Sequence, residues 1–303
     1  TAALVVGMTL PVFAETWFIE DGNISISAGT NGNHVEQGEK KQDETTETII
    51  TNRESTASSN TVTIEAGEGK TVDVTLENVN INTSKAAVSV TGKGDTNIEL
   101  NGNNTLTSGS GHAGLEHNKT DDSGTLTITD NDNDGKLDAK GGTDGAGIGG
   151  SDEHDGQVTI TGGEITATGG NGAAGIGGGA GDTDAVGGDG DVTISGGTIT
   201  ATGGRLGAGI GGGAYGNGTV TVTDGDITAK ATGRYGAGIG GGYGAKPKPS
   251  GTLIGGNGTV TISGGTITEA SGGYMAAGIG SGFQGLGTVT IEGDAVIKNA
   301  QGG

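Results

Sequence analysis

The phrase Ala-Gly-Ile-Gly, first seen at Ala146–Gly149, decides the fold because it occurs five times in the second half of the chain. The other copies are Ala174–Gly177, Ala208–Gly211, Ala237–Gly240 and Ala277–Gly280. A Val-Thr-Ile or Val-Thr-Val triplet ends at Ile160, Ile194, Val222, Ile262 and Ile291, and an apolar residue follows five positions later, at Ile165, Ile199, Ile227, Ile267 and Val296. From each repeated Ile to the end of the next triplet the distance varies, at 12, 18, 12, 23 and 12 residues. Fixed strands joined by one loop of variable length predict a solenoid.

The composition of the 303 residues supports this interpretation. Glycine accounts for 70 residues without a collagen-like period, Pro for 3, and aromatic residues for only 3% of the chain. The β-branched triplets nevertheless give every repeat an apolar side that can be buried. An interior of Ile, Val, Leu and Ala suits a stack of small, similar layers better than an ordinary globular core.

Three apolar segments per repeat, separated by Gly-rich corners, predict an all-β fold, namely a three-sided parallel β-helix with three short strands per coil. We count about eight or nine coils. Strands that stack about 4.8 Å apart would make a rod roughly 40 Å long. Side chains at equal offsets from each repeated Ile should then form internal ladders of Ile, Val and Ala.

The chain divides into three parts. Residues 1–14 contain the apolar run AALVVGMTLPVFA and end in Ala14, which is typical of the remnant of a signal peptide. About 20 apolar residues are needed to span a bilayer, so this run is too short for a membrane anchor. Residues 15–61 are expected to form an N-terminal cap and a loop, with 31–59 as a long loop or a poorly formed first coil. Residues 62–303 are expected to form the β-helix, truncated at its C-terminus.

The net charge of −21 limits the partners of the chain. Repulsion from phosphate disfavours nucleic acid and anionic membrane surfaces as partners. The many carboxylates offer oxygen ligands to a hard cation such as calcium. The absence of Cys excludes disulfides and thiolate metal sites.

The runs VTISGGTITATGG and GAGIGGG, preceded by WFIEDGNISI and VTLENVNI, cover most of the chain after residue 14. In these runs the sequence resembles the secreted carbohydrate-binding β-helix proteins of Gram-positive bacteria. The resemblance implies a right-handed helix related to pectate-lyase-like folds and a role in binding plant or host polysaccharide. It carries over no site residue, because no sharp motif of that group is matched here.

Alternation in Ala-Gly-Ile-Gly places Ala and Ile inside and both glycines outside. The stacked glycines Gly147, Gly175, Gly209, Gly238 and Gly278 have two interpretations. In the first, they are required at a sharp corner or under a covering loop that packs on bare backbone. Alternatively, they form a flat surface on which a polymer lies close to the chain.

Residues that flank these glycines favour carbohydrate binding. Aromatic rings can stack on sugar faces, and Arg can bind hydroxyl or carboxylate groups through its planar guanidinium. The alternative is that the rings only fill the corners of the solenoid. The candidate binding residues are Arg205, Arg234, Tyr215, Tyr235, Tyr243, Tyr274 and Phe283.

A metal site is suggested by Asp130, Asp132 and Asp134, which alternate as in the first half of a calcium-binding loop. The twelfth position is Gly141 instead of Glu, so a solvated Asp/Asn turn is the competing interpretation. Calcium is therefore the one cofactor that the sequence suggests.

Taken together, the sequence predicts a secreted or cell-surface protein that binds polysaccharide and is not an enzyme. We expect a monomer or a part of a larger surface protein, without nucleic acid as a partner and without membrane insertion of the mature chain. A polysaccharide lyase or glycoside hydrolase on the same fold is the main alternative, and a structural adhesin stalk is another. No residues pair convincingly as nucleophile and base.

Overall fold

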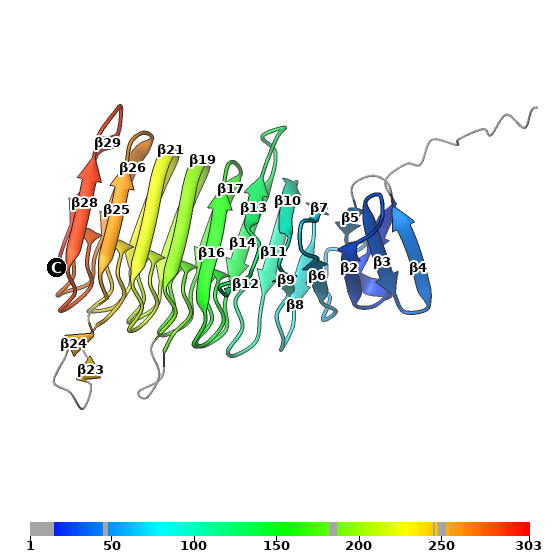
Figure 1. The fold of residues 1–303 in the computed structure, drawn as a ribbon, viewed down its shortest axis with the longest axis horizontal. Helices are drawn as coiled ribbons and strands as arrows, with labels where there is room; N and C mark the ends of the chain where they lie inside the picture. The colour runs from blue at the N-terminus through cyan, green and yellow to red at the C-terminus, as the bar shows by residue number, and fades with distance from the viewer. Residues whose placement is uncertain (1–14, 45–47, 182–186, 245, 248–252, 255) are drawn as a thin grey trace, which may run out of the picture.

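The protein, described by a computed structural model over residues 15–44, 48–181, 187–244, 246–247, 253–254 and 256–303, is a parallel β-helix. Its coils stack in chain order along the long axis of the molecule (Figure 1). Each regular coil has a first strand with the Val-Thr-Ile triplet, a second strand with the apolar residue five positions later, and a third strand with Ile-Gly. The first turn joins strands one and two, the second turn joins strands two and three, and the third turn leads to the next coil. The predicted signal peptide lies outside the described residues.

The strands form three parallel stacks. The first strands are β1 (Thr16–Phe18), β5 (Thr48–Thr51), β7 (Thr71–Glu77), β10 (Asp95–Asn101), β13 (Leu126–Thr129), β16 (Asp155–Ile160), the first parts of β19 (Gly190–Gly203) and β21 (Gly218–Ala231), β25 (Gly258–Ile262) and β28 (Gly287–Ile291). The second strands are β8 (Asn80–Asn82), β11 (Asn103–Thr107), β14 (Lys136–Lys140), β17 (Glu164–Thr168), the second parts of β19 and β21, β26 (Thr266–Ser271), β29 (Val296–Ile297) and β30 (Ala300–Gln301). The third strands are β2 (Ile24–Ala28), β6 (Val62–Ala66), β9 (Val88–Gly92), β12 (Leu115–Lys119), β15 (Ile148–Gly149), β18 (Ile176–Gly177), β20 (Ile210–Gly211), β22 (Ile239–Gly240) and β27 (Ile279–Gly280).

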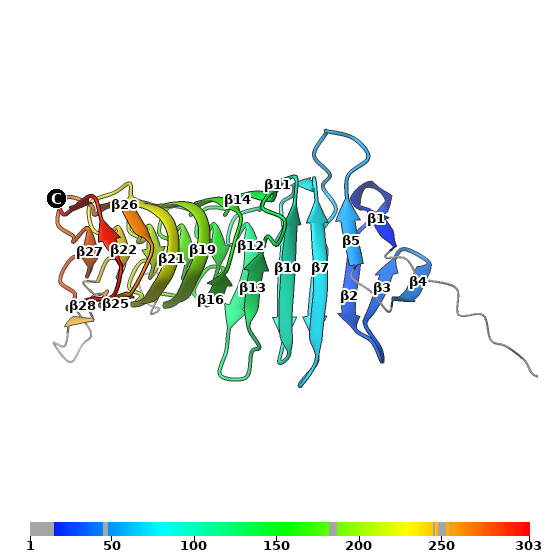
Figure 2. The ribbon, with the colours of Figure 1, turned by 90° about the horizontal axis from the view of Figure 1, so that it is seen from above.

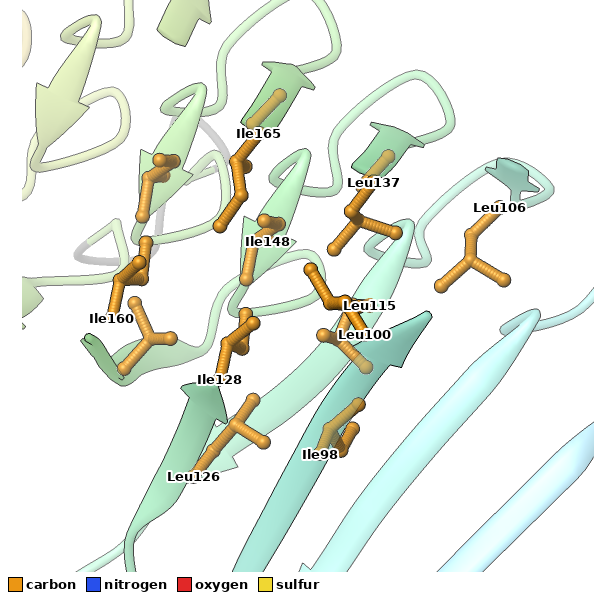
Figure 3. Packing of buried hydrophobic residues seen from close by; sticks show 14 of the residues in the cluster. Ile98, Leu100, Leu106, Leu115, Leu126, Ile128, Leu137, Ile148, Ile160 and Ile165 are labelled. Atoms are coloured by element: carbon orange, nitrogen blue, oxygen red, sulfur yellow. The ribbon is translucent and has the colours of Figure 1, made fainter. Parts of the chain in front are cut away.

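The predicted ladders are confirmed. Ile160, Ile194 and Val222 occupy successive rungs of the first stack, and Ile165, Ile199 and Ile227 those of the second. Side chains from all three stacks meet in the interior, which is fully buried along most of its length (Figure 3). Burying one Ile or Val stabilises a fold by about 1.5–3 kcal/mol, so the repeated rungs supply most of the cohesion.

The N-terminal end differs from the prediction. The segment 31–59, expected to be a loop or a poorly formed coil, contains β3 (Asn33–Gln37), β4 (Lys40–Glu44) and β5. The first two extend the β2 sheet by antiparallel pairing and lie beyond it at the N-terminal end (Figure 2). The 3₁₀ helix η1 (Ile19–Asp21) and the small antiparallel pair β23 (Lys246–Pro247) and β24 (Leu253–Ile254) complete the described elements. No helix in the described part of the chain is long and apolar enough to cross a bilayer.

One predicted rung of the last coil is wrong by a single residue. Val296 was expected to follow Ile267 in the second stack, but Ile297 pairs with Ile267 and Val296 pairs with Thr266. The first turn of this coil therefore holds one residue more than the first turns of the four coils before it. A constant five-residue spacing could not detect that insertion.

Side chains of Asp and Asn bind the third turns together. The Oδ1 atom of Asp155 accepts a hydrogen bond from the Asp189 backbone N–H at 2.7 Å. The Oδ1 atom of Asp189 in turn accepts one from the Asn217 backbone N–H at 2.6 Å. Asn217 then accepts from the Asn257 N–H at 3.0 Å. Burial raises the pKa of the Asp189 carboxyl, although hydrogen bonds from Asn217 oppose this shift.

We expect the substitution Asp189→Asn to raise the melting temperature by about 2 °C at pH 7. Because the folded-state pKa is raised, the stability contributed by this group is complete below its unfolded pKa and is lost as pH rises through the folded value. Asn keeps the acceptor oxygen without the charge, as at Asn217 in the next coil. The two melting temperatures should therefore converge near pH 3.5, below the unfolded pKa of about 3.9.

Thermal unfolding at both pH values checks this expectation. The matched control is Asp191→Asn, which removes the 2.7 Å ion pair with Lys119 and should not stabilise the protein. A destabilised Asp189→Asn variant at pH 7, or an equal difference at both pH values, would contradict the assignment.

Candidate functional site

The second turns stack into one edge of the solenoid, which we call the second-turn edge. The Asn171 N–H donates to the Thr143 carbonyl at 2.5 Å, and the Met275 N–H donates to the Arg234 carbonyl at 2.9 Å. A Cβ atom on Gly233, the residue before Arg234, would lie 1.8 Å from the Arg205 carbonyl oxygen. Arg205 and Arg234 thus occupy neighbouring coils on the same edge, as the repeat predicted.

A groove of about 550 Å³ runs along this edge over five successive coils. Between its glycines it is lined by Thr107, Lys140, Thr143, Asn171, Arg205 and Thr232, among others. None of its lining residues carries a carboxylate. The groove therefore offers hydroxyl, amide and cationic groups along a line parallel to the solenoid axis.

The cations of this edge are free to meet a ligand. Lys140, Arg205 and Arg234 are exposed and make no ion pair with any residue that the structure describes. Lysines elsewhere are often paired, as Lys136 is with Glu164 and Lys230 with Glu269, both at 2.7 Å. Lys140 and Arg205 line the groove and Arg234 lies one coil further on, so this edge is locally positive in a chain of net charge −21.

Charge is distributed unevenly over the three edges. The second turns from 83–87 to 272–278 contain a single carboxylate, Asp144. The same turns contain three cationic side chains, those of Lys85, Arg205 and Arg234. The acidic run Asp130–Asp134 lies on a first turn, and Ser151–Asp155 belongs to a third turn and the start of β16. An anionic ligand therefore meets less repulsion along the second-turn edge than along the other two.

Four of the five candidate aromatic residues form one cluster beside this edge. The Tyr235 ring centroid lies 4.8 Å from that of Tyr243 and 5.2 Å from that of Phe283, and the Tyr215 and Tyr243 centroids are 5.3 Å apart. All four side chains are half-buried. The rings thus pack partly on one another and cover the turns, which leaves only part of their faces for a ligand.

Tyr274 is different because its side chain is 70% exposed. With Met275, Ser281 and Gly282 it lines a hollow of about 560 Å³ on the second-turn edge of the last regular coil. Of the candidate aromatic rings, Tyr274 is the one most open to stacking on a sugar.

The stacked glycines do not form an open surface. Gly147, Gly175, Gly209, Gly238 and Gly278 are all buried. A Cβ atom on Gly209 would lie 2.6 Å from both the Gly238 carbonyl oxygen and the Lys230 backbone nitrogen. The interpretation as a polymer-binding surface is therefore wrong, and packing on bare backbone is confirmed. The final Gly of each phrase meets a second constraint, with φ of +124° at Gly149 and +130° at Gly280.

The acidic group that could hold a cation differs in membership from the prediction. In the described residues, Glu99, Asp130 and Asp132 bring one carboxylate oxygen each within 4.8 Å of one another. Asp134 is not part of this group, and its Oδ1 atom accepts a long hydrogen bond from the Gly102 N–H instead. The sequence did not reveal Glu99 as a member because it lies one coil before Asp130 and Asp132. The Glu99 carboxylate also accepts hydrogen bonds from the backbone and side-chain amides of Asn131.

Comparison with known proteins identifies the repeat. A family model described as a beta helix repeat matches residues 133–152, 158–180, 192–214 and 260–283. These segments include the second turns that carry Thr143, Asn171 and Arg205, whereas Arg234 lies between two matched segments. No curated protein and no solved structure matches the chain.

Proposed function

We propose that this protein binds polysaccharide, without chemical conversion, through the second-turn edge, and that it acts outside the cell or at the cell surface. The observation that carries the proposal is a row of cations, Lys140, Arg205 and Arg234, which have no ion-pair partner among the described residues and lie along one edge of a strongly acidic molecule. An acidic polysaccharide, with carboxylate or sulfate groups, fits this chemistry best.

Each group in the groove has a role in this proposal. The guanidinium groups of Arg205 and Arg234 donate paired hydrogen bonds to carboxylates, and the Lys140 ammonium adds a point charge. Thr143 and Asn171 bind sugar hydroxyls between the cations. Tyr274 stacks on a ring, whereas Tyr215, Tyr235, Tyr243 and Phe283 support the turns and border the ligand.

Two observations favour binding over a lyase or hydrolase activity. Glycoside hydrolysis generally needs a pair of carboxyl groups at the substrate, and no carboxylate lines the groove. The acidic group of Glu99, Asp130 and Asp132 lies at a first turn, on a different edge from Arg205 and Arg234. A stalk without a ligand would not require cations to be kept unpaired along one edge.

A glycan array, probed with and without a chelator, tests the function. We expect binding to acidic polysaccharides and weak or no binding to neutral ones. An array without acidic hits would favour the structural stalk. Release of unsaturated or reducing products from a bound glycan would instead favour an enzyme.

For calcium, we propose Glu99, Asp130 and Asp132 as the ligands in place of the earlier set with Asp134. Added calcium should then raise the melting temperature relative to chelator, and Glu99→Gln should abolish that rise. The control is Asp138→Asn, an exposed carboxylate on β14. A shift that survives in Glu99→Gln, or no shift in the unchanged protein, would contradict the site.

A further inference from the structure

The second-turn edge continues toward the N-terminus beyond the groove that contains Arg205. There a second groove, of about 620 Å³, is lined by Asn23, Asn60, Thr61, Asn82, Ser84 and Lys85, among others. These residues precede the third strands β2, β6 and β9, so they occupy the same turn of the solenoid in the first three coils.

Backbone hydrogen bonds join the two grooves. The Thr83 N–H donates to the carbonyl oxygen of Thr107 at 3.1 Å, and the Gly109 N–H donates to that of Lys85 at 3.0 Å. Thr83 lines the N-terminal groove and Thr107 the other. The grooves are therefore neighbouring sections of one edge, without an intervening element.

The chemistry of the N-terminal section matches that of the other. Its lining residues carry hydroxyl, amide and ammonium groups and include no carboxylate. Lys85 is exposed and makes no ion pair in the described part of the chain. The stack of second strands runs in the order β8, β11, β14, β17 and β19. Lys85, Lys140 and Arg205 are thus each two coils apart, about 10 Å along the axis.

The geometry points to a second binding section at Asn60, Asn82 and Lys85 that holds the continuation of the same acidic polysaccharide chain. This inference rests on the proposed function. The glycan lies parallel to the solenoid axis, and its repeated anionic groups meet cations at regular intervals. From the turn of Asn23 to that of Tyr274 there are eight coil steps, so the bound chain extends over about 38 Å. A short oligosaccharide fills only the section around Lys140 and Arg205.

Calorimetry with homogalacturonan fragments of defined length tests this assignment. The unchanged protein should bind a long fragment, which covers both sections, about tenfold or more tightly than a tetramer, because the added section supplies another charge-assisted contact. The double variant Asn82→Ala/Lys85→Ala should lose that gain and keep the affinity for the tetramer. The matched control is Lys70→Ala/Asn82→Ala, which retains Lys85 and instead removes an exposed lysine from a third turn. This control should keep much more of the difference in affinity between the long fragment and the tetramer.

The outcomes separate this inference from the proposed function. If the tetramer binds but longer fragments gain nothing, or if Asn82→Ala/Lys85→Ala binds long fragments like the unchanged protein, the N-terminal section is refuted and the function stands. If neither fragment binds, both are refuted. Circular dichroism and melting of each variant exclude loss of fold as the cause.

Discussion

Binding of polygalacturonate is expected to weaken by about 100-fold at low salt in the double variant Arg205→Ala/Arg234→Ala, because each charge-assisted hydrogen-bonding group contributes about 1.5 kcal/mol or more. Both side chains are exposed and unpaired in the described structure. Their removal should therefore leave the melting temperature unchanged. Isothermal titration and differential scanning calorimetry of the same samples measure both quantities.

A variant of equal charge serves as the control for this result. Lys70→Ala/Lys298→Ala also removes two exposed cations, but neither lies in a second turn. It should bind polygalacturonate nearly as well as the unchanged protein. Equal weakening by both pairs would show that only the overall charge matters, and an unchanged isotherm for the arginine pair would reject the site.

Stability should respond most strongly at the buried glycines. We expect Gly209→Ala to destabilise the protein by about 3 kcal/mol, because overpacking a closely packed interior typically costs about 1–3 kcal/mol and here the obstruction is backbone. The added Cβ would meet the Gly238 carbonyl oxygen and the Lys230 nitrogen, both at 2.6 Å. The Gly238 carbonyl accepts the Ile210 N–H at 3.0 Å and Lys230 lies within β21, so neither atom can move away without disturbing the stacking of the coils.

Denaturant unfolding of Gly209→Ala and Gly67→Ala provides the comparison. A Cβ on Gly67 would meet only the Lys70 side chain, at 3.9 Å, so this variant should be nearly neutral. If Gly209→Ala were as stable as Gly67→Ala, close packing would not explain why glycine occupies the stacked positions.

The repeat made the solenoid predictable from the sequence. When Ile160 and Ile194 are taken as equivalent positions of successive coils, residues at equal offsets from them are expected to stack on one another. This reasoning placed Arg205 and Arg234 on the same edge. The same reasoning failed at Val296, where one inserted residue shifts the second strand. Alignment within a column is thus predictable only while the turns keep their length.

Other features depend on contacts that hydropathy does not reveal. Asn33 and Gln37 are buried in β3, where the Asn33 amide donates to Thr48 and Asp73 and the Gln37 amide donates to the carbonyls of Phe18 and Gly22. Such polar residues look like a loop in the sequence. Glu99 likewise approaches Asp130 only because β10 and β13 stack in register. The burial of the glycines required knowing what packs against them.

Cysteine protection along the groove tests the central claim most directly, because these 303 residues contain no Cys and each introduced thiol is therefore the only one among them. Asn171→Cys places a thiol in the groove, and Ser195→Cys places one at an exposed first turn on another edge. With saturating polygalacturonate, we expect alkylation by iodoacetamide to slow severalfold at position 171 and to be unchanged at 195. Protection at 195 without protection at 171 would contradict the account.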